Sequence, residues 1–169
     1  AKGDMFPPSA KGFLWSERRP HGVAGLITPW NFPLAIPLWK AAPALAAGNA
    51  VVIKPSPDAV ASAALLNEIL HSALPAGLFT VVYGGAEVGE QLVEHADIIS
   101  FTGSNAVGRQ IAVAATRRGI PVQAEMGGQN AAIVLPCADY EATAAMIAGA
   151  AMWFAGQKCT CTRRVITLG

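Results

Sequence analysis

The segment Gly156-Gln157-Lys158-Cys159 presents a thiol after a glycine-containing turn. An apolar run of helical composition precedes it at 148–154, and a β-like run follows at 165–168. A thiol held between two regular elements is a candidate nucleophile, because a thiolate is intrinsically nucleophilic. The alternative is that Cys159 is a small buried apolar residue, which is the commoner fate of a free cysteine.

Two polar residues elsewhere have chemistry that complements a cysteine nucleophile. Asn31 lies between Trp30 and Phe32-Pro33, in a loop that prolines stiffen. An amide held in a rigid loop can donate to an oxyanion, or it can simply satisfy the turn. Glu125 ends a β-like segment beside Gly127-Gly128. It is a candidate general base, with capping of the next element as the alternative.

Two further segments have features of ligand sites. Lys54 ends an apolar run before Pro55, where a lysine can bond ribose hydroxyls or phosphate, or can be a solvated strand end. The segment from Gly103-Ser104 to Gly108 opens a helix, and free N–H groups at a helix start can bind an anion. Its spacing is neither G-x-G-x-x-G nor a P-loop, so Ser104 as a plain helix cap stays open.

The elements that must position these residues alternate along the chain. Long connections between strands favour an α/β fold with a Rossmann-like, doubly wound parallel sheet of five strands. Ligands of such sheets bind outside the carboxyl ends of the strands, where the candidate residues lie. The predicted strands are 23–27, 50–54, 79–83, 97–101 and 121–125, and the predicted helices are 34–47, 58–74, 85–94 and 104–116.

Beyond Gly128 the alternation restarts, with a strand predicted at 131–135, a helix at 140–153 and a last strand at 165–168. The pair Gly127-Gly128 is interpreted as a hinge into a second α/β domain. Residues 1–20 are rich in proline and glycine, and predict an extended arm or an edge hairpin. In the helix at 58–74, one face is predicted to carry Leu65, Leu66, Ile69 and Leu70.

Composition excludes several classes of function. The 169 residues are 53% hydrophobic and 14% charged, which supplies a core and argues against disorder. The net charge of +1 argues against a nucleic-acid partner. No apolar run reaches the roughly 18–20 residues that cross a membrane, so a membrane partner is not expected.

The three cysteines, Cys137, Cys159 and Cys161, are too few for a disulfide framework and suit a reducing, cytoplasmic location. Cys159 and Cys161 lack the C-x-x-C spacing, and the histidines are scattered, so no metal site is predicted.

Five motifs occur together in one order: Trp30-Asn31-Phe32-Pro33, Lys54-Pro55-Ser56, Phe101-Thr102-Gly103-Ser104, Glu125-Met126-Gly127-Gly128 and Gly156-Gln157-Lys158-Cys159. From about Gly22 to the end, the chain resembles the aldehyde dehydrogenase superfamily. Within it, the chain is similar to bacterial semialdehyde dehydrogenases of the 2-oxoglutarate or succinate semialdehyde type.

The resemblance implies catalytic roles. Cys159 matches the nucleophile, which attacks an aldehyde to give a thiohemiacetal, and hydride transfer to nicotinamide then leaves a thioester. The Asn31 amide and the Cys159 N–H match the oxyanion hole. Glu125 matches the base that activates the hydrolytic water, and Lys40 matches the lysine of a proton relay near that glutamate.

The resemblance also implies a site for NAD or NADP. Lys54 matches the lysine that binds the adenosine ribose, and Ser104 matches a residue on the pyrophosphate. NAD-preferring members carry Glu where this chain has Pro57, so the resemblance admits NADP beside NAD. The implied cofactor-binding residues are Ile27, Trp30, Lys54, Ser56, Gly85, Gly89, Gly103, Ser104 and Gly127.

Two other positions depart from the family. Gln129 stands where Lys is common, and no function is attached to it. Cys161 stands where a small residue is frequent; a disulfide on oxidation is possible there, and packing is favoured.

The family's larger C-terminal portion, which holds the nicotinamide ribose and most of the substrate tunnel, is missing from the 169 residues. The chain is therefore expected to be an internal fragment: an arm at 1–21, an NAD(P)-binding domain at 22–126 and the truncated start of a catalytic domain at 127–169. The whole protein is expected to oxidise a small-molecule aldehyde as a cytoplasmic homo-oligomer, dimer or tetramer. The alternative is a nucleotide-binding module without turnover.

Overall fold

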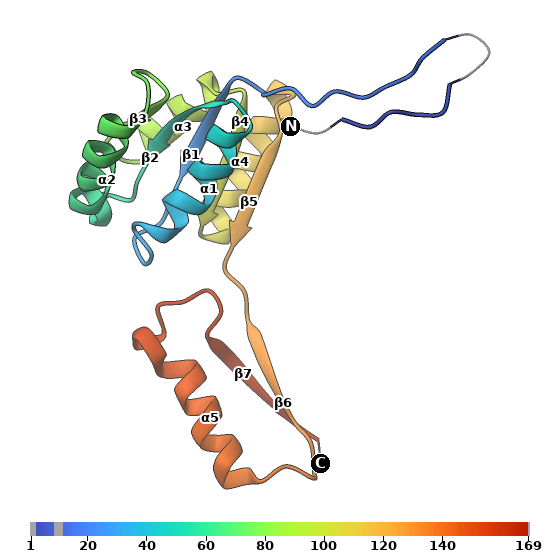
Figure 1. Ribbon diagram of the computed structural model, residues 1–169. Helices are drawn as coiled ribbons and strands as arrows, with labels where there is room; N and C mark the ends of the chain where they lie inside the picture. The colour runs from blue at the N-terminus through green and yellow to red at the C-terminus, as the bar shows by residue number, and fades with distance from the viewer. Residues whose placement is uncertain (1–2, 9–11, 169) are drawn as a thin grey trace. The chain divides into compact units, whose positions relative to one another are not determined.

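The computed structural model describes residues 3–8 and 12–168. The chain divides into two compact units, Ala1–Glu125 and Met126–Gly169, each with a sheet of its own (Figure 1). Among the described residues, no helix is long and apolar enough to cross a membrane.

The first unit contains a five-stranded sheet in the order β3-β2-β1-β4-β5, which confirms the predicted doubly wound fold. β1 lies at the centre, parallel to its neighbours, with Ala24 opposite Val51 on one side and Ile98 on the other. The strands are β1 (Val23–Ile27), β2 (Ala50–Lys54), β3 (Phe79–Val81), β4 (Ile98–Gly103) and β5 (Val122–Met126).

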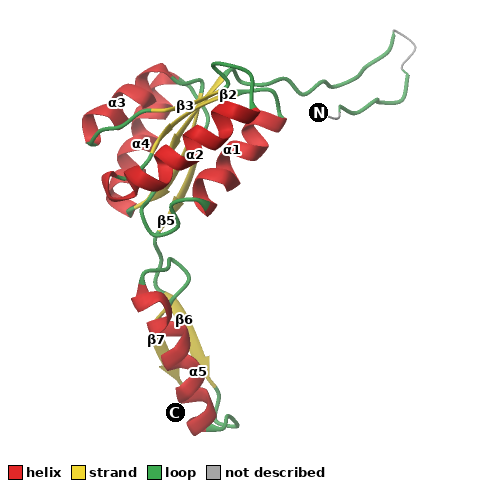
Figure 2. Ribbon diagram, turned by 60° about the vertical axis from the view of Figure 1, so that its left-hand side comes forward, coloured by secondary structure: helices red, strands yellow, loops and turns green. Residues whose placement is uncertain are grey.

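Helices cover both faces of this sheet (Figure 2). α1 and α2 pack on a core that contains Leu26, Val51 and Ile53, whereas α3 and α4 pack on a core that contains Ile27 and Ile99. Neighbouring strand residues point to opposite faces, so two cores on one sheet follow from the period of two. The helices are α1 (Ala35–Ala46), α2 (Val60–Ala73), α3 (Ala86–His95) and α4 (Asn105–Arg118).

The second helix differs from its prediction in two ways. It begins with a separate 3-10 turn, η1 (Pro57–Ala59), because the Ser56 hydroxyl accepts the Asp58 N–H and caps that turn. Leu66 is buried, but Leu65 and Ile69 are 52% and 54% exposed, so the predicted four-residue face is wrong. The buried stripe is narrower because Leu65 and Ile69 lie about 100° and about 60° around the helix from Leu66, on the side away from buried Ala63.

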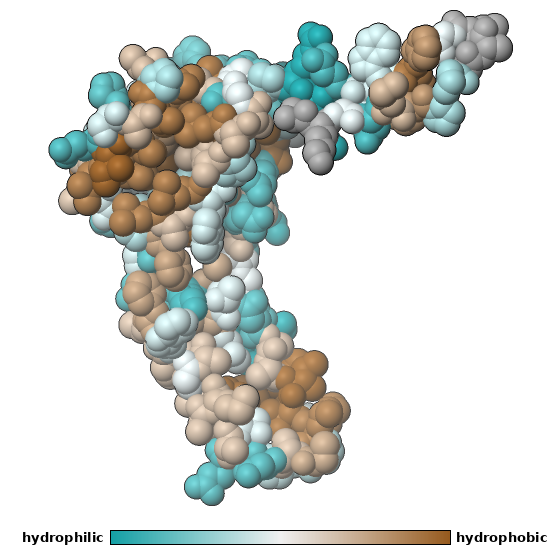
Figure 3. All heavy atoms as spheres, in the orientation of Figure 1, coloured by the Kyte–Doolittle hydropathy of each residue, from teal (hydrophilic) through white to brown (hydrophobic). Residues whose placement is uncertain are grey.

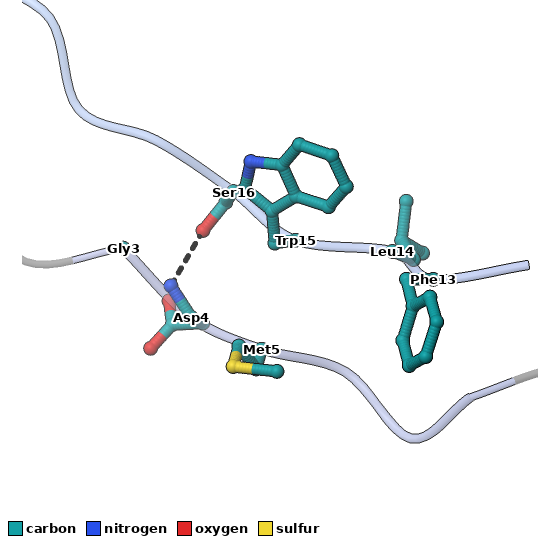
Figure 4. A pocket seen from close by; sticks show the side chains of 7 residues that line it. All are labelled: Gly3, Asp4, Met5, Phe13, Leu14, Trp15 and Ser16. Carbon is teal, nitrogen blue, oxygen red and sulfur yellow. Dashed lines mark hydrogen bonds between the residues drawn. The ribbon is translucent and has the colours of Figure 1, made fainter.

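The N-terminal arm pairs with itself as an antiparallel ribbon (Figure 4). Met5 lies opposite Trp15, the Phe6 N–H donates to Leu14 O at 3.0 Å, and the Ser16 N–H donates to Asp4 O at 2.8 Å. The two arms of the predicted hairpin therefore pair through a β-bridge, without forming regular strands, while its tip at 9–11 lies outside the described residues.

The second unit is a β-α-β element. β6 (Asn130–Val134) pairs in parallel with β7 (Thr162–Thr167), and α5 (Tyr140–Met152) connects them through a 3-10 turn, η2 (Trp153–Gly156). β7 begins at Thr162 and not at Val165 as predicted, because Thr162 and Arg164 also pair with β6, with a register irregularity at Arg163 between them.

Apolar residues remain on the surface of the second unit. None of the described residues of α5 is buried. Figure 3 shows hydrophobic residues gathered over β6 and β7, where Ile133 is 64% exposed and Val165 is 52% exposed. A face of this kind on a small unit is typical of a surface that packs against further polypeptide.

Candidate active site

A cavity of about 740 Å³ opens in the first unit where β1 and β2 end, beside α3 and α4. This is the edge of the sheet at which doubly wound proteins bind ligands, and the volume is in the range of ligand pockets. Four of the predicted cofactor residues line it, together with Pro57: Ile27, Lys54, Gly85 and Gly89.

Lys54 is the cation of this cavity. Its side chain is 7% exposed, and Nζ donates to Pro55 O at 2.9 Å and to Gly84 O at 3.3 Å. An ammonium has three N–H donors, so these two carbonyls leave one for a ligand. Burial lowers the pKa of Lys54 below its ordinary value of 10.5, and the negative charge of Glu87 partly offsets that effect.

One observation supports the fit of a ligand such as a ribose beside Lys54. Gly89 forms part of the wall, and a Cβ built there would lie 3.6 Å from Lys54 Cε, so a longer side chain would fill the space that glycine leaves. The buried Thr28 hydroxyl has no hydrogen-bond partner among the described residues, but Thr28 is not part of the cavity lining.

α4 begins with Ser104 as its cap, as the sequence predicts. The Ser104 hydroxyl accepts the Val107 N–H at 3.4 Å and caps the helix. A Cβ on Gly103 would lie 2.5 Å from Phe101 Cζ, so the close turn requires glycine there. The cap and a role on a phosphate are compatible, because free N–H groups remain in the first turn.

The structure places the other predicted cofactor residues elsewhere. Trp30 is 46% exposed in the loop after β1, and Ser56 caps η1. Gly127 belongs to the second unit, where a Cβ would meet nothing within 4 Å. Among the described residues of the first unit, Trp30, Ser56, Gly103 and Ser104 lie outside the cavity lining.

A second polar cluster lies on the α1 side of the sheet. Lys40 is 9% exposed, and its Nζ donates to Ser100 Oγ at 2.8 Å and to Phe101 O at 3.3 Å. Ser100 Oγ in turn donates to Gln123 Oε1 at 2.7 Å. Burial lowers the pKa of Lys40 below 10.5, and the charge of Glu125 partly offsets that effect.

The sequence prediction included Lys40 and Glu125 but missed Ser100 and Gln123. Ser100 and Gln123 could both have been predicted from strand alternation, in which successive side chains point to opposite faces of the sheet. Ile99 and Phe101 pack in the core beneath α3 and α4, so Ser100 between them faces α1. The same reasoning on β5 places Gln123 and Glu125 on the α1 face, since Val122 and Ala124 pack on the other core.

Cys159 lies in the second unit, in the turn between η2 and β7, and is exposed. This exposure disagrees with the alternative that Cys159 is a buried apolar residue. Cys161 is the buried cysteine of the pair, 2% exposed and free, as the packing interpretation predicts.

The backbone before Cys159 has an unusual conformation. Phe154, Ala155 and Gly156 have φ values of 57°, 54° and 70°, and the first two are non-glycine residues in the left-handed region. Such residues cost on the order of 1–3 kcal/mol each and persist only where their surroundings hold them. Backbone of this kind is found preferentially at functional sites.

Side chains hold this turn at several points. Asn130 Nδ2 donates to Cys159 O at 2.6 Å and to Cys161 O at 3.1 Å. Arg163 donates to Gly156 O at 2.6 Å, and the Lys158 ammonium lies 3.9 Å from the centre of the Trp153 ring. Asn130 and Arg163 were not predicted as site residues, because a polar residue in an exposed strand gives no pattern that marks its partner.

The predicted catalytic residues lie in both units. Asn31, Lys40 and Glu125 belong to the first unit, with Asn31 half-buried in the loop before α1, and Cys159 belongs to the second. Their assembly around one substrate is therefore a proposal. Within residues 3–8 and 12–168, no group of three or more His, Cys, Asp or Glu residues could hold a metal ion.

A doubly wound parallel sheet with a lysine in a cavity at its strand ends is the arrangement typical of nucleotide-binding α/β proteins. Comparison with known proteins narrows this class. The sequence matches the Aldehyde dehydrogenase family over residues 1–168, and the chain belongs to that family.

Individual relatives agree with the family. The chain is 48% identical, over 97% of its length, to an alpha-ketoglutaric semialdehyde dehydrogenase of Bacillus subtilis, of which it covers 35%. It resembles the structure of a 3,6-anhydro-L-galactose dehydrogenase in complex with NAP, with a TM-score of 0.92 and 36% identity over 98% of this chain and 36% of that one. The chain thus spans about a third of the length of these relatives.

A further solved structure is that of PnpE in complex with nicotinamide adenine dinucleotide. It matches with a TM-score of 0.87 and 37% identity, over 99% of this chain and 35% of that one. The two neighbours are thus described in complex with NAP and with nicotinamide adenine dinucleotide, respectively.

Proposed function

We propose that the whole protein oxidises an aldehyde, and specifically a semialdehyde, to a carboxylic acid with NAD⁺ or NADP⁺. The observation that carries the proposal is the exposed Cys159 thiol on a strained, hydrogen-bonded turn in a chain of the aldehyde dehydrogenase family. The semialdehyde class is supported by the Bacillus subtilis relative and by an alpha-ketoglutarate semialdehyde dehydrogenase of Haloferax volcanii, 44% identical over 90% of this chain and 33% of its own length.

The chemistry begins with covalent capture. The Cys159 thiolate bonds to the aldehyde carbon, and the carbonyl oxygen becomes an oxyanion that accepts hydrogen bonds from the Asn31 amide and the Cys159 N–H. Nicotinamide, when bound, supplies the hydride acceptor for the oxidation. Covalent capture divides one difficult reaction into an oxidation and a hydrolysis.

Hydrolysis then releases the acid. Glu125 takes a proton from water as the water oxygen bonds to the acyl carbon, and the carbon–sulfur bond breaks to return the Cys159 thiolate. Lys40 then accepts the proton from Glu125 in a relay. The two groups interact electrostatically, because the charge of Glu125 acts on the Lys40 amine.

The cofactor would be held at the cavity beside α3 and α4. Lys54 suits the ribose, and Ser104 with the first turn of α4 suits the pyrophosphate. Pro57 lines the cavity where NAD-preferring members have a carboxylate, so the proposal includes both NAD and NADP.

The domain assignments follow from these roles. Residues 22–126 form the NAD(P)-binding domain, residues 127–169 begin the catalytic domain, and residues 1–21 form an extended arm or connecting strand.

Free cysteines suit a reducing, cytoplasmic location. The whole protein is proposed to be a homo-oligomer, dimer or tetramer, whose partner molecule is the aldehyde substrate.

Replacement of the nucleophile tests the proposal. In the whole protein, Cys159→Ala should abolish aldehyde-dependent NAD(P)H formation, while NADH binding, measured by its fluorescence, stays within about twofold of the unaltered protein. Cys137→Ala is the matched control, because Cys137 is also exposed and free, and it should retain turnover. Turnover by Cys159→Ala would remove Cys159 from the mechanism.

A second candidate is that the 169-residue chain by itself binds nucleotide without turnover. It is favoured by the fact that the chain covers only 35% of its Bacillus subtilis relative. The isolated chain should bind NAD(H) or NADP(H) but form no more than trace NAD(P)H from an aldehyde. Sustained turnover by the isolated chain would contradict this candidate.

A further inference from the structure

We infer that Ser100 and Gln123 are positioning residues for Lys40: the Ser100 hydroxyl, held by Gln123, aims the Lys40 amine and can bond it with or without its extra proton. The inference rests on the proposed function, because it gives the Lys40 relay its hydrogen-bonded support. Nothing in the five family motifs identifies either residue.

Three elements bring the residues together. Lys40 comes from α1, Ser100 from β4 and Gln123 from β5, and β4 and β5 are neighbours in the sheet. Ser100 is partly buried on β4, and Gln123 lies on the same face of β5, where its side chain is exposed. Lys40 is thus a buried cation with a polar row beside it, and the row continues on β5 to Glu125.

Each hydrogen bond in this cluster has a defined donor and a defined acceptor. Ser100 Oγ donates its one proton to Gln123 Oε1 at 2.7 Å, and therefore receives the Lys40 N–H at 2.8 Å through a lone pair. Phe101 O can only accept, and it lies 3.3 Å from the same nitrogen. The arrangement matches the ammonium form of Lys40, which donates to both.

The hydroxyl also accommodates the neutral amine. A serine O–H rotates freely, so it can leave Gln123 and donate to the lone pair of an uncharged Lys40. Burial brings that uncharged form closer to neutral pH by lowering the pKa of Lys40, against the opposing charge of Glu125 on β5. When the relay returns a proton from Glu125, the hydroxyl turns back to Gln123 and Nζ donates again.

A hydrogen bond to the charged form favours that form. Removal of the Ser100 hydroxyl should therefore lower the pKa of Lys40 further and release its side chain. Ser100→Thr keeps the hydroxyl and should restore both properties. Gln123→Glu places a carboxylate beside the pair and should raise the pKa of Lys40.

The first measurement is a pH titration of the Lys40 ¹³Cε resonance by NMR in the chain, assigned by its loss in Lys40→Met. Ser100→Ala should shift the midpoint to lower pH by at least about half a unit, as expected for the loss of one charge-assisted hydrogen bond. The control Ser72→Ala also removes a serine hydrogen bond, to Ile69 O at 2.8 Å in α2, and should leave the midpoint unchanged.

The second measurement is the pH profile of aldehyde oxidation in the whole protein. Ser100→Ala should lower kcat about tenfold with KM within about twofold, and should shift the pH limb that reports Lys40 in the direction seen by NMR. The tenfold loss is smaller than the ~10²–10⁴-fold contribution of an acid–base group itself, as expected for a residue that only positions such a group. Ser100→Thr should recover most of kcat, and Ser72→Ala should match the unaltered protein.

The outcomes separate this inference from the proposed function. An unaltered protein that turns over, with Ser100→Ala giving the same kcat and pH profile, would overturn the positioning role even if the NMR midpoint moved. An unchanged NMR midpoint in Ser100→Ala would also overturn it. An unaltered whole protein that oxidises no aldehyde would instead contradict the proposed function itself.

Discussion

Two lysines are buried at opposite faces of one sheet, Lys40 beneath α1 and Lys54 against Gly89 of α3. A buried ammonium is costly unless it is hydrogen-bonded, and each of these donates to two protein oxygens. Neither is needed to fill the core, because an apolar side chain would fill the same space without the desolvation cost. The burial of these two charged side chains is the observation on single residues that most favours a functional explanation.

The buried lysines predict a pH dependence of stability. Both have a pKa below the unfolded value of 10.5, so between the folded pKa and 10.5 the unfolded chain binds more protons than the native one. The free energy of unfolding should therefore rise with pH through that window. Urea unfolding from neutral pH to about 10.5 should show the rise, and Lys40→Met should show a smaller one. Equal slopes in the two proteins would contradict the assignment to Lys40.

Glu87 is a carboxylate that directly follows Ala86 of the cavity lining, and sequence reasoning overlooked it. Glu87 Oε1 accepts the Gly85 N–H at 2.9 Å. This hydrogen bond, and secondly one from the backbone N–H of Glu87 itself, lower the pKa of the Glu87 carboxyl below its ordinary value of 4.5. It is therefore ionised at neutral pH, and its charge acts on Lys54. Pro57 lies in the loop after β2, so its lack of charge does not exclude a carboxylate on α3 near Lys54.

Glu87 should weaken binding of a ribose 2′-phosphate through like-charge repulsion. In the whole protein, Glu87→Gln should raise the ratio of kcat/KM with NADP to kcat/KM with NAD several-fold. Glu68→Gln, a change on α2 away from the cavity lining, is the matched control. An unchanged ratio in Glu87→Gln would show that the carboxylate does not act on the cofactor phosphate.

At the scale of elements, the sequence predicts the strands and helices of the first unit well, because apolar strand runs and amphipathic helices alternate with clear turn residues. Strand alternation would also have predicted the Ser100 and Gln123 cluster. The left-handed backbone at Phe154 and Ala155 could not be predicted. Neither residue type favours φ above zero, and the conformation depends on contacts made by distant residues such as Arg163.

Two glycines in regular elements are predicted to respond oppositely to alanine. A Cβ on Gly25, in β1, would lie 2.7 Å from Ile99 Cδ1 and 2.9 Å from Ala96 Cβ. Gly25→Ala should therefore destabilise the chain by about 1–3 kcal/mol through overpacking. A Cβ on Gly89, in α3, makes only ordinary contacts from 3.6 Å, so Gly89→Ala should stabilise by about 0.5–1 kcal/mol.

Urea denaturation of both variants beside the unaltered chain measures these changes in the free energy of unfolding. Destabilisation by Gly89→Ala, or no effect of Gly25→Ala, would contradict the packing described between β1 and α3.

At the scale of the whole molecule, the two units differ in how completely they bury their apolar residues. The first has a core on each face of its sheet. The second pairs two strands with a helix that has no buried residue among those described. The chain covers about a third of its relatives, and we propose that the remaining polypeptide of the whole protein packs on the second unit.

For the whole molecule, the proposed function requires that Cys159 of the second unit act together with Asn31 and Glu125 of the first. Sequence motifs predict these residues through resemblance to the family, and the structure shows hydrogen bonds from Asn130 and Arg163 that hold the turn at Cys159. Their joint action depends on the placement of the two units, which local patterns in the sequence do not encode.

The most direct test is to trap the acyl group. The whole protein with Glu125→Gln should oxidise a semialdehyde in the presence of NAD⁺ but hydrolyse the thioester slowly, so the acyl-enzyme should accumulate. After acid quench and proteolysis, mass spectrometry should find the acyl group on the peptide that contains Cys159, with stoichiometry near one and with Cys137 unmodified. Formation of NADH with Cys159 unmodified throughout would contradict the account.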